Sequence, residues 1–284
     1  MQRQIRLPGI VKVLLAAVVF SFSGVLSKWM PWSAFSLVGA RALIASILMA
    51  LWRGSFKVPL NKGTVTGALG VCLTSVFFML ANKYTTAANA IVLQYAMPAF
   101  VIAFCVVFLH QKPSGRDIAA VGCALTGVVL CFMDNLGGGS MLGNFFALLS
   151  AVTYAVVFMS AKMAGVVAMD YVYLGNVLSS AFVVALFFDP AVASSGASVW
   201  CVAGAMGIIL AAGYTLLGMS IGEVNPVTAA IISNVEPVLN PTWVFLALGE
   251  MPGAKAIWGA VVVLATVTVY SITAQRGQRR ARSD

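Results

Sequence analysis

Residues 233–241 read SNVEPVLNP, and they lie inside an apolar run that extends from Pro226 to Leu248. A run of this length is long enough to cross a bilayer as a helix. A carboxylate costs at least about 2.5 kcal/mol at the bilayer centre, so Glu236 is expected to face protein or a wet cavity. Pro237 cannot donate to the carbonyl of Ser233, which leaves that oxygen without its helical partner. The stretch therefore marks a specialised point in a membrane helix.

The composition of the whole chain is that of a membrane protein. Of its 284 residues, 61% are hydrophobic and 9% are charged, whereas soluble domains carry about a quarter charged residues. The five cysteines are odd in number and form no CxxC pair, so they are predicted to be small buried hydrophobes. The net charge of +9 comes from scattered basic residues without an aromatic-studded basic face, which argues against nucleic acid as a partner. We predict an all-α integral membrane protein in contact with lipid.

Apolar windows of about 20 residues recur along the chain, and about ten are found. Short connectors that carry Pro, Gly, Asn or Asp separate them, and none has room for a soluble domain. The first window follows Arg3 and Arg6 but is too long for a signal peptide and lacks a convincing cleavage site. The predicted windows are 10–28, 33–52, 64–82, 88–109, 116–133, 142–163, 171–188, 199–219, 226–248 and 254–273.

The distribution of lysine and arginine predicts the orientation in the membrane. With the N-terminus in the cytoplasm, most basic residues outside the spans fall on the cytoplasmic side, and Lys28, Lys83 and Lys255 fall on the other. The positive-inside rule then places both termini in the cytoplasm, which requires an even number of spans. Ten spans in the cytoplasmic (inner) membrane satisfy that condition.

The chain is predicted to be duplicated. A shift of 134 residues lays Lys28 on Lys162, and a shift of 139 residues lays Pro98 on Pro237. The first repeat is expected over residues 1–136 and the second, with a basic C-terminal tail, over 137–284. A unit of five helices is odd in number, so the second copy must enter the membrane from the opposite side. This is an inverted repeat, a common plan in secondary transporters.

The duplicated prolines mark the expected site, because transporters of this plan bind substrate near the midplane, often at interrupted helices. Pro98 and Pro237 lie near the middle of the fourth and ninth windows, and Pro241 repeats the interruption in the ninth. All three could serve as kinks or gates, or they could only fit the helices to their neighbours. Polar side chains gather beside them: Gln94 and Tyr95 in the first copy, and Ser233, Asn234, Glu236 and Asn240 in the second.

Two ionisable residues stand well inside predicted spans. For Arg41 in the second window we favour a structural role, through a salt bridge or hydrogen bonds to carbonyl groups. For Glu236 two roles are left open: a structural contact, or contact with substrate or a coupling proton. The lone histidine, His110, falls at a predicted helix end and is expected to be a loop residue.

The stretches LQYAMPAFVIAFCVVFLHQKPS (93–114) and ISNVEPVLNPTWVFLALGEMP (232–252) resemble the paired signature of EamA-type transporters of the drug/metabolite transporter superfamily. In that family each repeat carries a proline in its fourth helix and ends the helix in a Leu-Gly-Glu-like turn. Leu248-Gly249-Glu250 matches that ending, so Glu250 is assigned a structural charge. Arg41 in GARALIASILMAL (39–51) resembles the arginine of the family's second helix.

The sequence departs from the family pattern at two places. His110-Gln111 stands where the first copy usually has Gly-Glu, which puts any role of that carboxylate in doubt. Phe20 and Tyr154 stand where a tryptophan often begins the polar part of the first helix of each copy. The second departure could alter the lining of a cavity.

The resemblance implies ten helices in two inverted halves, a central cavity, and export of small metabolites such as amino acids. Hydrogen-bonding side chains beside aromatic ones suit an amphipathic solute. Tyr95, Tyr154 and Tyr214 could equally be core residues with satisfied hydroxyl groups. The side chains expected in the cavity are Ser23, Phe78, Asn82, Gln94, Tyr95, Tyr154, Asn176, Tyr214, Ser233, Asn234 and Glu236.

These features favour a secondary transporter that moves a small amphipathic metabolite outward by alternating access. A membrane-embedded scaffold or channel is the alternative, followed by a membrane enzyme, for which the sequence offers no HExxH or Ser/His arrangement. No GxxxxGK[ST] motif is present, so ATP is not expected to drive the chain. We predict no catalytic residues, metal or cofactor. Proton coupling, the substrate's identity and the oligomeric state are left open.

Overall fold

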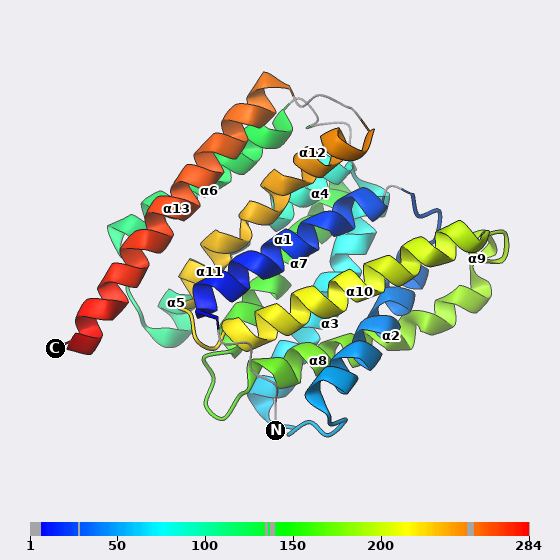
Figure 1. Cartoon of the computed structure of the whole chain (residues 1–284), viewed down its shortest axis with the longest axis horizontal. Coiled ribbons are helices and arrows are strands. Elements are labelled where there is room, and N and C mark those ends of the chain that lie inside the picture. The colour runs from blue at the N-terminus through cyan, green and yellow to red at the C-terminus, as the bar shows by residue number, and fades with distance from the viewer. Residues whose placement is uncertain (1–6, 28, 134–135, 137–139, 249–252, 284) are drawn as a thin grey trace.

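The structure is a computed structural model that describes residues 7–27, 29–133, 136, 140–248 and 253–283. The described chain is helical almost throughout, with short connections (Figure 1). Its helices, in chain order, are α1 (Gly9–Ser27), α2 (Ala34–Arg53), α3 (Lys62–Tyr84), α4 (Ala87–Gln94), α5 (Met97–Leu109), α6 (Gly115–Phe132), α7 (Met141–Ser160), α8 (Ala168–Ser180), the 3-10 helix η2 (Ala181–Phe188), α9 (Pro190–Ala193), α10 (Ala197–Ser220), α11 (Pro226–Ser233), α12 (Val235–Leu248) and α13 (Ala254–Ser283).

Side-chain caps begin many of these helices. Ser33, Asn61 and Ser140 accept hydrogen bonds from backbone N–H groups in the first turns of α2, α3 and α7. Ser114 and Asp117 form a reciprocal capping box at the start of α6. These caps satisfy N–H groups that the helices cannot bond internally. Local sequence thus sets where the helices begin.

Each of the ten predicted windows contains helix, but the windows do not all form single helices. The fourth window is divided into α4 and α5, the ninth into α11 and α12, and the seventh passes from α8 into η2. In the part of the chain that is described, eight helical segments are long and apolar enough to cross a membrane. The segments Gly9–Ser23 and Pro226–Leu239 are apolar but shorter. A total of ten spans therefore stays a prediction.

The two halves of the chain pack against each other in swapped pairs. The third helix of the first half, α3, packs along α7, the first helix of the second half, and α1 packs in turn along α10. Likewise α3 packs on α8 while α10 packs on α2, and the last helices of each half, α6 and α13, pair with each other. Figure 1 shows the α6–α13 pair at one edge of the molecule. This exchange of partners indicates approximate twofold symmetry.

Glycines permit the closest helix contacts. Gly127 and Gly259 face each other where α6 crosses α13, and a methyl group on either would meet the backbone of the other helix. Gly39 likewise allows α2 to lie against the backbone of η2. In lipid no hydrophobic effect drives helices together, so their association depends on close packing. Small residues at the crossings allow that packing.

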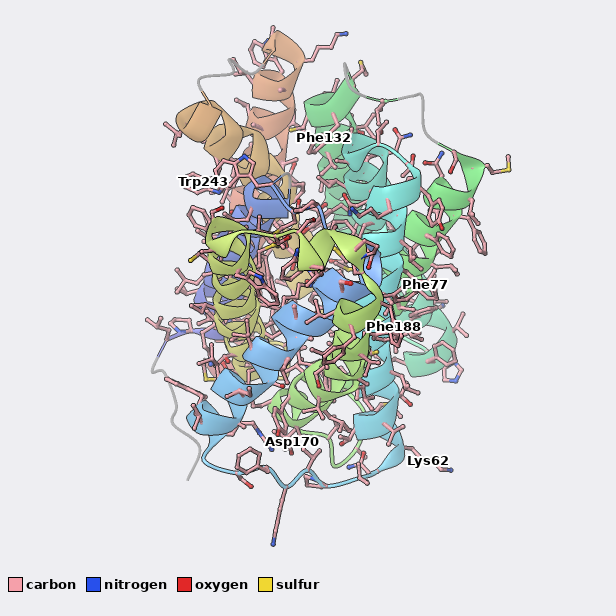
Figure 2. All side chains as sticks on the ribbon, turned by 90° about the vertical axis from the view of Figure 1, so that its right-hand side faces the viewer. Lys62, Phe77, Phe132, Asp170, Phe188 and Trp243 are labelled. Atoms are coloured by element: carbon pink, nitrogen blue, oxygen red, sulfur yellow. The ribbon has the colours of Figure 1, made fainter. Side chains whose placement is uncertain are left out.

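At one end of the bundle, polar contacts join the two halves. Arg53 at the end of α2 forms a buried ion pair with Asp170 of α8 and lies over the ring of Tyr173 at 4.6 Å. Lys12 pairs with Glu223 at 2.7 Å. Figure 2 shows Asp170 and Lys62 at this end and Phe132 and Trp243 toward the other. Residues predicted to be cytoplasmic are thereby gathered together, while the orientation itself remains a prediction.

The other end of α2 is also tied to the second half. The Ser33 N–H donates to Asp189 Oδ2 at 2.7 Å, and Trp32 Nε1 donates to Ser195 Oγ at 2.8 Å. Burial by itself would raise the pKa of Asp189, but hydrogen bonds from Ser33, Ser36 and Ala191 hold it below its usual range. Both ends of α2 are therefore anchored, and the middle of that helix is held in place.

Candidate functional site

The first helix break lies between α4 and α5. Helix α4 ends at Gln94, Tyr95 and Ala96 form a turn, and α5 begins at Met97. Pro98 is then in the first turn of α5, where a helix has no internal acceptor for an N–H group. A proline is harmless there, whereas inside a continuous helix it costs about 3 kcal/mol. A two-residue turn thus divides the span Ala87–Leu109, placed so that the proline stands in the first turn of α5.

The second half repeats this break at the corresponding place. Helix α11 ends at Ser233, Asn234 lies in the turn, and α12 begins at Val235. Pro237 stands in the first turn of α12, as Pro98 does in α5. The two breaks share their backbone plan and their prolines. Their side chains differ, and the chemistry of the site follows from that difference.

Four polar side chains converge beside the breaks, and we call them the tyrosine–glutamate cluster: Tyr95, Tyr154, Tyr214 and Glu236. The hydroxyl of Tyr95 hydrogen-bonds the carboxylate of Glu236. Tyr154 of α7 and Tyr214 of α10 lie close enough to that carboxylate to interact with its charge. The three tyrosines are at most 7% exposed. One member comes from the first half and three from the second, so the cluster bridges the halves.

Neighbouring helices fix the orientation of Tyr214. Its hydroxyl hydrogen-bonds Ser75 of α3. Its ring meets Phe20 of α1 edge-on, with the ring centroids 5.2 Å apart, and Gly213 allows α10 to approach that phenylalanine closely. In Figure 1, α1, α7 and α12 lie between the α6–α13 pair and the α2–α8 pair. The cluster therefore stands where helices of both halves meet.

Asparagine and serine side chains complete the second break. Ser233 Oγ donates to Ala229 O at 3.0 Å, and Asn234 Nδ2 donates to Ala230 O at 3.1 Å. The Oδ1 atom of the buried Asn234 has no donor among the described residues. A buried acceptor without a partner costs about 1–3 kcal/mol. This oxygen is accordingly available to a group that can donate a hydrogen bond.

The arrangement suits the binding of a polar head next to an apolar body. A carboxylate and an amide oxygen accept hydrogen bonds, the tyrosine hydroxyls donate or accept them, and the aromatic rings give an apolar wall. Aromatic faces beside a carboxylate also favour a cation such as an ammonium group.

Arg41 lies near the same cluster. Its side chain is 5% exposed and comes close enough to Tyr214 for an electrostatic interaction. The expected salt bridge or carbonyl contacts are not found: within residues 7–27, 29–133, 140–248 and 253–283, Arg41 has no hydrogen bond or ion pair, and its Nε is enclosed without an acceptor. The role predicted for this residue thus lacks its structural partners.

Other predicted site residues are dispersed around the cluster. Gln94 is buried at the first break. Asn82 Nδ2 donates to Phe78 O at 2.8 Å within α3, and Phe78 packs in the apolar core. Asn176 is fully buried in α8, where Nδ2 donates to Val172 O. Ser23 is partly buried on α1. Among the described residues, no hydrogen bond, ion pair or ring contact joins Ser23, Phe78, Asn82 or Asn176 to the cluster.

Three predictions lie outside what is described: the side chains of Asn240 and Pro241, and Glu250 altogether. The sequence reasoning also missed Ser75, which meets Tyr214, and a contact between α12 and α1. Ser75 has nothing in its local sequence to distinguish it from other serines of apolar helices. Trp243 stacks on Phe22 with ring centroids 4.4 Å apart and donates to Ser21 Oγ at 2.7 Å. A tryptophan well inside a span was a usable signal for that contact.

Two stretches of the chain match a known protein family. The model of the EamA-like transporter family matches residues 7–133 and 141–272. The chain belongs to the EamA-like transporter family. It is therefore a multi-pass membrane protein of a family of transporters, belonging to the drug/metabolite transporter superfamily, as the sequence resemblance predicted.

A solved crystal structure of another protein has the same fold. It matches with a TM-score of 0.78 at 18% sequence identity, and the match covers 94% of this chain and 98% of that one. At that identity the likeness is informative about the fold alone. A search of curated proteins returns no match. Within the described residues, no three His, Cys, Asp or Glu side chains group closely enough to hold a metal ion.

Proposed function

We propose that this EamA-like protein is a secondary transporter that moves a small amphipathic metabolite, an amino acid or a related compound, out of the cell by alternating access. The observation that carries the proposal is the tyrosine–glutamate cluster, which joins the two halves at their broken helices. If the halves rock against each other, side chains drawn from both change their spacing. A substrate held between them would then be exposed first to one side and then to the other.

The proposal places the protein in the cytoplasmic membrane with both termini in the cytoplasm. Its support is the bias of basic residues and the gathering of Lys12, Arg53 and Lys162 at one end of the bundle. Cysteine substitutions at exposed Lys62 and Lys255, labelled in intact cells with an impermeant reagent, test this topology. Labelling at position 255 but not at 62 is expected.

Counterflow in proteoliposomes is the decisive test of transport. Liposomes loaded with an unlabelled amino acid are expected to accumulate the same labelled compound transiently, because only a carrier exchanges bound substrate across a membrane. A channel would equilibrate the label without an overshoot, and a scaffold would not move it. Absence of an overshoot for a panel of amino acids would overturn the proposal.

A matched pair of variants ties transport to the break. Gln94→Ala removes a buried amide at the end of α4, and counterflow is expected to fall by about threefold or more, because positioning within the site is lost. Gln111→Ala removes the same group from an exposed position and should leave counterflow within the error of wild type. Repeating the measurement with an imposed pH gradient decides whether protons are coupled to the substrate.

A further inference from the structure

The buried guanidinium of Arg41 is not explained by the packing of the protein. It stands in the middle of α2, which is anchored at both ends, and it makes no ion pair or hydrogen bond with any residue that the structure describes. An isolated charge inside a membrane span is costly, so such residues generally face a partner or a pathway. By contrast Arg53, on the same helix, has an ion pair with Asp170, donates to two backbone carbonyls and lies over the ring of Tyr173, although its Nε, like that of Arg41, has no acceptor.

The position of Arg41 relative to Glu236 is informative. Both residues interact with Tyr214, but no ion pair joins them. Arg41 and Glu236 therefore both lie near one tyrosine without forming an ion pair with each other. If the arginine served only to neutralise the carboxylate, a direct ion pair would be the cheaper arrangement. The separation instead leaves each charge able to meet a group of opposite sign.

We infer that Arg41 is the anion-binding group of the transport site, and that the substrate class is a zwitterion whose carboxylate meets Arg41 while its ammonium group faces Glu236 and Asn234. The inference rests on the proposed transport function. A planar guanidinium matches a carboxylate with two parallel hydrogen bonds. A single guanidinium balances one negative charge, which favours a carboxylate over a doubly charged phosphate. Asn234 Oδ1, which lacks a donor, supplies an acceptor for the ammonium group.

The test uses four probes of one shape: L-leucine, L-leucinamide, 3-methylbutylamine and N-acetyl-L-leucine. Counterflow by the wild type is expected to be at least ~10-fold faster for leucine than for the amide or the amine, because the latter two leave the guanidinium unpaired. Arg41→Gln should reduce leucine flux at least ~10-fold and bring the leucine-to-leucinamide ratio close to one, and Arg41→Lys should recover part of both.

Thermal stability separates binding from a structural role. Removing an uncompensated buried charge should leave the melting temperature of Arg41→Gln equal to or above that of wild type. A structural arginine would give a lower value. Arg116→Gln, the same change at an exposed site, is the control and should alter neither flux nor stability.

Two outcomes count against these ideas in different ways. Equal wild-type transport of leucine and leucinamide, with Arg41→Gln unaffected, would overturn the role of Arg41 and leave the carrier function intact. A lower melting temperature of Arg41→Gln with an unchanged leucine-to-leucinamide ratio would also overturn it. Absence of counterflow for every probe with the wild type would overturn the amino-acid carrier itself.

Discussion

The break between α4 and α5 and the break between α11 and α12 have the same backbone and different side chains. Each interrupts its helix just before a proline, Pro98 or Pro237. At the position before the proline the first half has Met97, which is fully buried, whereas the second half has Glu236. The comparison teaches that the interruption belongs to the duplicated fold. The carboxylate occurs in the second half alone, so the two halves contribute different chemical groups to the site.

The largest effect is expected from altering the two non-equivalent residues. Glu236→Gln replaces the carboxyl group that meets the Tyr95 hydroxyl with an amide and should lower counterflow at least ~10-fold, because the acidic group of the site is lost. Met97→Leu conserves volume and should leave flux within about twofold of wild type. Proteoliposome counterflow with both purified variants measures this. Equal losses in the two variants would show that the halves share the chemistry as well as the fold.

The prolines should give intermediate effects that are alike in the two halves. Pro98→Ala and Pro237→Ala each restore an N–H that can bond the carbonyl of Gln94 or Ser233, which favours a continuous helix and displaces Tyr95 or Asn234. Counterflow is expected to fall about three- to tenfold in each, with melting temperature unchanged or raised. An effect confined to Pro237 would contradict the equivalence of the two interruptions.

A smaller effect is expected at the hydroxyl of Tyr95. Tyr95→Phe leaves the Glu236 carboxylate without its phenol donor, and the expected cost is about 1–3 kcal/mol of stability together with a severalfold loss of flux. Tyr84→Phe makes the same change at an exposed position and serves as the control. Unchanged flux and melting temperature in Tyr95→Phe would show that the contact contributes nothing to the site.

The smallest effect concerns the end of the first broken helix. His110 has φ = 52°, a left-handed conformation that costs most residues about 1–2 kcal/mol. The family usually has glycine here, and His110→Gly should raise the free energy of unfolding by about 0.5–1 kcal/mol, since glycine's own entropy offsets part of the relief. Gln111→Gly, without that backbone conformation, should give no gain in melting temperature. A lower stability of His110→Gly would show that the imidazole makes a needed contact.

Much of the fold could be predicted from local sequence. The apolar windows locate the helical segments because the bilayer sets their length, and Ser33, Asn61 and Ser114 set helix starts through hydrogen bonds to their own first turns. The prolines located both breaks. The conformation of the turn between α4 and α5 depends on where the neighbouring helices pack. No local sequence pattern shows where that is.

The candidate site was predicted only in part. Tyr95, Tyr154, Tyr214 and Glu236 were chosen as polar or aromatic residues of apolar helices, and the structure brings them together. The same criterion also selected Asn82 and Asn176, whose Nδ2 atoms donate to carbonyl groups of their own helices. The criterion cannot distinguish a side chain that bonds its own backbone from one that faces another helix. That distinction needs the rotation of each helix about its axis.

The sequence by itself determined that this chain is a membrane protein, is duplicated and has two helices disturbed by prolines, because these properties follow from hydropathy, periodicity and a missing N–H. Only the tertiary structure decided the partners of the charged residues. Arg53 has Asp170, Glu236 has Tyr95, and Arg41 has no partner among the described residues. The physical reason is that burial makes a charge depend on groups within a few ångströms, and those groups come from helices remote in the chain.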